Sequence, residues 1–80
     1  MKTLTQMRIV RLEQQVTLSE LGELVGVDHT AMSRIERGQW AVNTDRAKEI
    51  ARVLGVAVTD LFSEEDGRLV AVPRELVATA

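Results

Sequence analysis

The stretch TLSELGELVGVDHTAMSRIERG, from Thr17 to Gly38, predicts two short helices joined by a tight turn. Thr17 and Glu20 form the pattern T-x-x-E, in which each side chain hydrogen-bonds the other residue's backbone N–H at a helix start. Gly26 ends this helix because glycine accepts the left-handed conformation of a C-terminal cap. Asp28 then caps the second helix, which is expected to run to about residue 37.

Helical patterns continue on both sides of this stretch. Apolar residues at positions 4, 7 and 10 predict a helix over residues 4–15. Asn43 is expected to cap a fourth helix that ends at Gly55, and a short fifth helix should run from Val58 to Phe62. The apolar positions expected to face the core are Leu21, Leu24, Val25, Val27, Met32, Ile35, Ala47, Ile50, Ala51, Leu54, Leu61 and Phe62.

The helical pattern weakens from residue 63 onward. SEEDG, residues 63–67, is typical of a solvated turn, and RLVAV, residues 68–72, of an extended strand. Pro73 favours the first turn of a brief helix in the following RELVA. We therefore divide the chain into a helical domain over residues 1–62 and a C-terminal extension over residues 63–80, which is a candidate for dimerisation or partner binding.

The composition of the 80 residues excludes several classes of site. The chain has no cysteine and one histidine, so it has no disulfide framework, thiolate zinc site, cysteine nucleophile or histidine metal cluster. We therefore expect no enzymatic activity, no metal and no cofactor. It contains neither an apolar run of membrane-spanning length nor a signal-peptide pattern, so we expect a cytoplasmic protein without membrane contact.

The charge is unevenly distributed along the chain. The net charge is −2, but residues 1–55 carry eight Lys/Arg against seven Asp/Glu. Residues 56–80 carry two against five, so the acidic excess lies in the C-terminal part. Any affinity for nucleic acid must therefore come from a local basic face, because the field of the whole protein does not supply it.

The order of these motifs resembles that of phage Cro/repressor-type helix-turn-helix proteins, also called the XRE family. The resemblance covers about residues 4–62 and includes TLSEL at 17–21, GV at 26–27, SRIERG at 33–38, ARVLGV at 51–56 and LF at 61–62. It implies an all-α, five-helix lambda-repressor-like domain, here with a short C-terminal extension that includes the candidate strand. It also implies binding of double-stranded DNA, with the helix after Asp28 in the major groove.

The resemblance assigns two sets of DNA contacts. Base contacts fall on the outer face of that helix, where the Arg34 guanidinium suits guanine O6 and N7 and the Thr30 methyl suits thymine. The alternative is an ordinary solvated polar face. Trp40 either packs on a DNA sugar or folds back over the fourth helix. The implied base contacts are His29, Thr30 and Arg34, and the implied phosphate contacts are Ser33, Arg37, Gln39, Trp40, Asn43 and Arg46.

A structural ion pair is a further implication of the resemblance. Arg11 in the first helix and Glu36 at the end of the third occupy positions that form a partly buried pair in the family. Such a pair would hold the third helix in place relative to the first. The alternative is two separate surface charges.

A homodimer is also implied, with contacts near the link between the fourth and fifth helices. The strand at 68–72 offers a second route, because an edge strand can pair with its twin; alternatively it folds on its own domain. The alternative for Val56, Val58 and Leu61 is that all three side chains belong to the core. The implied dimer residues are Val56, Val58, Leu61, Leu69, Val70 and Val72.

Two departures from the family pattern bear on function. Leu18 stands where family members carry a phosphate-binding Gln, and Gly22 stands where they carry Ala, which costs up to about 1 kcal/mol of helix propensity. The preferred interpretation is a sequence-specific transcriptional regulator, a repressor that binds an inverted repeat as a dimer. The alternative, which Leu18 and the acidic tail favour, is an antitoxin-like or adaptor module that holds another protein through its C-terminal extension.

Overall fold

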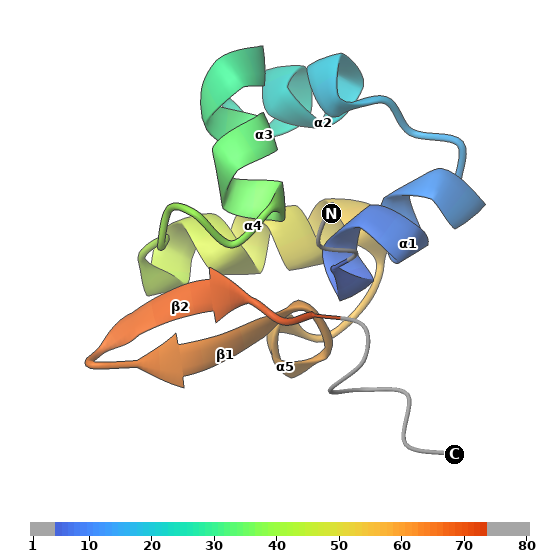
Figure 1. Cartoon of the computed structure of the whole chain (residues 1–80). Helices are drawn as coiled ribbons and strands as arrows, with labels where there is room; N and C mark the ends of the chain where they lie inside the picture. The colour runs from blue at the N-terminus through green and yellow to red at the C-terminus, as the bar shows by residue number, and fades with distance from the viewer. Residues whose placement is uncertain (1–4, 74–80) are drawn as a thin grey trace.

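The computed structural model describes residues 5–73, and within them five helices are followed by one β-hairpin (Figure 1). All five helices and both strands contribute buried side chains to one core. The hairpin lies beside α4 and the short α5 (Figure 1). The elements are α1 (Gln6–Glu13), α2 (Leu18–Val25), α3 (His29–Glu36), α4 (Thr44–Leu54), α5 (Val58–Leu61), β1 (Phe62–Glu65) and β2 (Arg68–Ala71).

Side-chain caps start the first four helices. Thr5, Thr17, Asp28 and Asn43 each accept a hydrogen bond from the backbone N–H three residues on, which confirms the three caps predicted from the sequence at 17, 28 and 43. α2 and α4 end at left-handed glycines, as predicted. The helix boundaries therefore follow from residues within one turn of each end.

The core lies where helical spacing predicts it, with one exception. Six core residues are fully buried: Met7, Leu21, Met32, Ala47, Ile50 and Leu61. Five more are buried beside them: Val25, Ile35, Ala51, Leu54 and Phe62. Val27 is partly buried and packs against this cluster. The prediction for Leu24 is wrong, because its side chain is 65% exposed. The buried stripe of α2 runs through Leu21, Gly22 and Val25, and Leu24 lies outside it.

The C-terminal extension contains a hairpin that the sequence analysis did not predict. β1 and β2 are antiparallel, with Phe62 opposite Ala71 and Glu65 opposite Arg68. The connecting residues Asp66 and Gly67 both have positive φ, 53° and 78°, as a two-residue type I′ turn requires. Residues 63–67, expected to form a solvated turn, are exposed, but residues 63–65 belong to β1. The predicted strand at 68–72 is confirmed as β2, and the fold is not purely helical.

The hairpin packs on the helices. Val42 and Leu69 exchange two backbone hydrogen bonds of 2.8 and 3.1 Å, and Val72 accepts one from the Gln6 N–H at 3.0 Å. Ala71 is 4% exposed and belongs to the same buried cluster as the helical core. Residues 62–73 therefore share the core of the helical domain. The helix expected after Pro73 lies outside the described residues.

Candidate nucleic-acid interface

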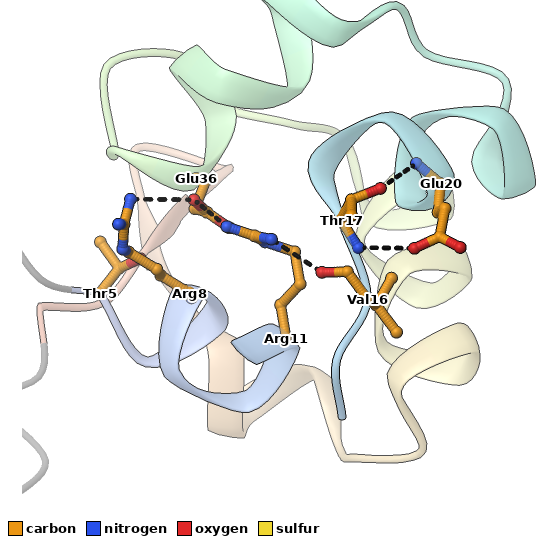
Figure 2. Close-up of polar contacts among 7 residues, drawn as sticks. All are labelled: Thr5, Arg8, Arg11, Val16, Thr17, Glu20 and Glu36. Carbon is orange, nitrogen blue, oxygen red and sulfur yellow. Dashed lines mark hydrogen bonds and ion pairs between the residues drawn. The ribbon is translucent and has the colours of Figure 1, made fainter. Parts of the chain in front are cut away.

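The start of α2 is held by the predicted capping box. The Thr17 N–H donates to the Glu20 carboxylate at 2.8 Å, and the Glu20 N–H donates to the Thr17 hydroxyl at 3.0 Å (Figure 2). The hydrogen bond from the Thr17 N–H lowers the pKa of Glu20 below its ordinary value of 4.5, and the Thr17 side chain adds to this lowering. Glu20 is therefore ionised at neutral pH, as the positive end of the α2 dipole favours.

The turn between α2 and α3 is so tight that it excludes a side chain at position 22. The Val27 N–H donates to the Gly22 carbonyl at 2.8 Å, and a Cβ placed on Gly22 would lie 2.3 Å from the Val27 carbonyl oxygen. It would also lie 3.3 Å from Cγ of Met32. Gly22 lowers the helix propensity of α2, but its lack of a side chain lets α2 lie close to the turn and to α3.

A buried ion pair fixes α3 against α1. Arg11 donates from Nε and Nη2 to the two carboxylate oxygens of Glu36, at 2.6 and 3.2 Å, and from Nη1 to the Val16 carbonyl at 2.7 Å (Figure 2). Arg11 is 6% and Glu36 3% exposed. Arg8 approaches the same carboxylate at 4.0 Å. The predicted structural pair is confirmed, and it sets the end of α3 relative to the scaffold.

The outer face of α3 gathers the predicted base contacts. His29, Thr30 and Arg34 are all exposed. Together with Ser33, Arg37 and Gln39, they line one shallow surface hollow. The structure therefore brings the three predicted base contacts and three of the predicted phosphate contacts onto one face. What this face binds stays a prediction.

Trp40 is 48% exposed and lies outside the buried core. The guanidinium carbon of Arg34 lies over its ring, 5.3 Å from the centroid. This contact was not predicted from the sequence, because it depends on the turn of the backbone at Gly38 that returns residue 40 to residue 34. Contact of this ring with DNA stays a prediction.

The remaining predicted phosphate contacts lie around the start of α4. Asn43 is exposed, and its side-chain oxygen accepts from the Arg46 N–H at 2.8 Å. The Arg46 guanidinium donates from Nη1 to the Val25 carbonyl and lies 3.4 Å from Glu49. Arg46 therefore links α4 to the C-terminal end of α2, a role that the sequence did not indicate.

Arg68 at the hairpin turn is an additional cation beside the candidate interface, and the sequence did not indicate its place there. Gly67 and Arg68 line the same hollow as Gln39, Trp40 and Asn43. Arg68 is exposed and stands beside Glu65 and Asp66, which lie along a neighbouring hollow. The Asp-Gly dipeptide at 66–67 was the signal for the hairpin that places this residue next to the loop after α3.

The predicted dimer surface requires two corrections. Leu61 is 0% exposed, so its side chain belongs to the core and offers no contact surface. Pairing of β2 with its twin is blocked at Leu69, because Val42 of the same chain uses both the N–H and the carbonyl of that residue. The strand thus folds on its own domain. The other predicted dimer residues, Val56, Val58, Leu69, Val70 and Val72, are partly buried.

Leu18, which had favoured a protein partner, packs against the core. Its side chain is partly buried against the hydrophobic cluster at the start of α2. Its apolar character therefore has a structural reason within the domain.

Among the helices of residues 5–73, none has the length and apolarity needed to span a membrane.

Comparisons with known proteins show the family to which the chain belongs. A "Neisseria hypothetical transcription factor" from Neisseria meningitidis serogroup B is 32% identical over 63 residues, which are 79% of this chain and 59% of that protein. The crystal structure of the clp gene regulator ClgR from Corynebacterium glutamicum matches with a TM-score of 0.65 and 33% identity, over 69% of this chain and 58% of that one. The chain thus spans less than two thirds of the length of either relative. Residues 5–62 match the family model of the helix-turn-helix domain. The chain therefore belongs to the helix-turn-helix domain family, in agreement with its resemblance to Cro/repressor-type proteins.

Proposed function

We propose that the protein is a sequence-specific, double-stranded DNA-binding transcriptional regulator that places α3 in the major groove. The observation that carries this proposal is the exposed polar face of α3, with His29, Thr30 and Arg34, on a helix whose end is fixed by a buried ion pair. The two relatives, a hypothetical transcription factor and a clp gene regulator, support the same class of protein.

The roles of the residues follow from their chemistry. Arg34 presents two parallel N–H donors that match O6 and N7 of guanine, and Thr30 and His29 contact neighbouring bases. Ser33, Arg37, Gln39 and the loop through Asn43 lie beside this face and contact phosphates, which set the position and orientation of the protein on the duplex. No residue has a catalytic role in this proposal.

Selection from a random duplex library, combined with a salt titration, tests the proposal. A DNA-binding regulator is expected to enrich a defined site and to lose affinity steeply as salt rises, because bound phosphates release counterions. Absence of duplex binding at any salt concentration would instead support the adaptor function. The observation that favours that alternative is the exposed acidic hairpin, with Glu64, Glu65 and Asp66, which offers a surface for a protein partner.

Arg34→Ala is expected to weaken binding to the selected site by about 1–3 kcal/mol, the usual worth of a bidentate base contact. Binding to random duplex should fall far less. Competition assays with both duplexes measure the difference. The matched control is Arg52→Ala, which removes an exposed arginine from the last turn of α4 and should affect neither duplex strongly. Equal losses on both duplexes for Arg34→Ala would identify a phosphate contact instead.

We further propose that two protomers repress by binding an inverted repeat. One recognition helix reads only a few base pairs, so a single domain has too little specificity to find one site in a genome. Two copies related by a twofold axis read half-sites about 34 Å apart. The partly buried residues Val56 and Val58 next to α5 offer the apolar contact surface.

Val58→Glu is expected to abolish cooperative binding while the circular dichroism spectrum stays that of the parent, because a charge then faces the partner protomer. Thr59→Glu, an exposed neighbour that adds the same charge, is the matched control and should leave cooperativity intact. Light scattering of the complex should give two protomers per duplex. One protomer per duplex, or an asymmetric selected site, would contradict the dimer.

A further inference from the structure

We propose that Trp40 is a positioning residue that holds the Arg34 guanidinium in place for base reading and thereby contributes to sequence specificity. This inference rests on the proposed DNA-binding function and deepens it. It replaces the predicted role of Trp40 as a phosphate contact with a role that acts through another side chain.

The end of α3 brings residue 40 back to residue 34. The Gly38 N–H donates to the Ile35 carbonyl at 3.1 Å, and the Gln39 N–H donates to the Arg34 carbonyl at 2.9 Å. This pair of bonds is the Schellman motif, and Gly38 takes the left-handed conformation that it needs, with φ of 79°. The Trp40 N–H also donates to the Arg34 carbonyl, at 3.3 Å. The backbone therefore fixes Trp40 beside Arg34 before any ligand is present.

The side chains meet in a cation–π contact. The Arg34 guanidinium carbon lies 5.3 Å from the Trp40 ring centroid, within the distance of about 6 Å at which such contacts stabilise. Within residues 5–73, Arg34 makes no ion pair with a carboxylate, so this ring is its side-chain partner. The guanidinium donors point outward in the plane of the group, and a ring against its face uses none of them. Arg34 stays able to form two hydrogen bonds with guanine.

Restriction of Arg34 favours specific binding. An exposed arginine samples many rotamers, and ordering it on a base edge costs side-chain entropy. A ring that already restricts the guanidinium reduces this cost for the base contact. A phosphate contact by Trp40 would strengthen binding to every duplex alike, so the two roles predict different results.

The first experiment compares Trp40→Leu with Trp40→Phe, which keeps an aromatic face. Dissociation constants are measured for the selected duplex and for the same duplex with the Arg34-dependent base pair replaced. Trp40→Leu is expected to lower the preference between the two duplexes by about two- to fivefold, the worth of an exposed cation–π contact. Trp40→Phe should retain most of the preference. In an Arg34→Ala background, Trp40→Leu should have no further effect on the preference.

The second experiment requires no DNA. Ring currents of the sole tryptophan should shift the Arg34 side-chain protons upfield in the NMR spectrum, and Trp40→Leu should return them to ordinary positions. Absence of this shift in the parent protein would overturn the proposal. Equal losses on both duplexes, or a Trp40→Leu effect on preference that persists without Arg34, would also overturn it. A protein that shows the ring-current shift but binds no duplex would refute the DNA-binding function, and the positioning role would fail with it.

Discussion

Glu36→Ala is expected to lower the free energy of unfolding by about 3–5 kcal/mol, because it leaves the Arg11 guanidinium buried without its carboxylate. A domain of 80 residues has a total stability of roughly 4–12 kcal/mol. The loss is therefore a large share of the whole, and the variant should be partly unfolded at 37 °C. Urea unfolding followed by circular dichroism measures the change.

Two further variants make this prediction specific to a buried pair. Glu49→Ala removes a carboxylate from an exposed pair with Arg46, whose side chains are 36% and 46% exposed, so it should cost at most about 1 kcal/mol. Replacing both members, as Arg11→Met with Glu36→Leu, should recover part of the lost stability, because apolar residues of similar size can replace a buried pair. A melting temperature of Glu36→Ala within a degree or two of the parent would reject the buried pair.

Gly22→Ala is expected to destabilise the domain, although alanine is the better helix former. The gain in helix propensity is at most about 1 kcal/mol. The added methyl, however, would lie 2.3 Å from the Val27 carbonyl oxygen, and overpacking of this kind costs about 1–3 kcal/mol or more when backbone must move. The steric cost therefore exceeds the gain, and the α2–α3 turn must open.

Thermal melting distinguishes the two effects. Gly22→Ala should melt at least about 4 °C below the parent, since about 1 kcal/mol shifts the melting temperature by 4–8 °C in a domain of this size. The control is Glu23→Ala, an exposed position on the same helix, which should stay within about 0.5 kcal/mol of the parent. A Gly22→Ala variant more stable than the parent would show that the turn has room for a methyl.

Part of the candidate interface on α3 was predictable from the sequence. Helical spacing after Asp28 places His29, Thr30 and Arg34 on the outer side, and all three are exposed. The Arg11–Glu36 pair followed from the resemblance to Cro/repressor-type proteins and is present. The contact between Arg34 and Trp40 was missed, because it depends on the path of the backbone after Gly38.

The sequence by itself determined where α2, α3 and α4 begin, because the capping side chains Thr17, Asp28 and Asn43 act within three residues along the chain. Only the tertiary structure decided which surfaces are free. β2 pairs with Val42 in place of a twin, and Leu24 faces solvent although its spacing suits a core. These outcomes depend on atoms that are distant in the chain and meet only when the domain packs, which local patterns do not encode.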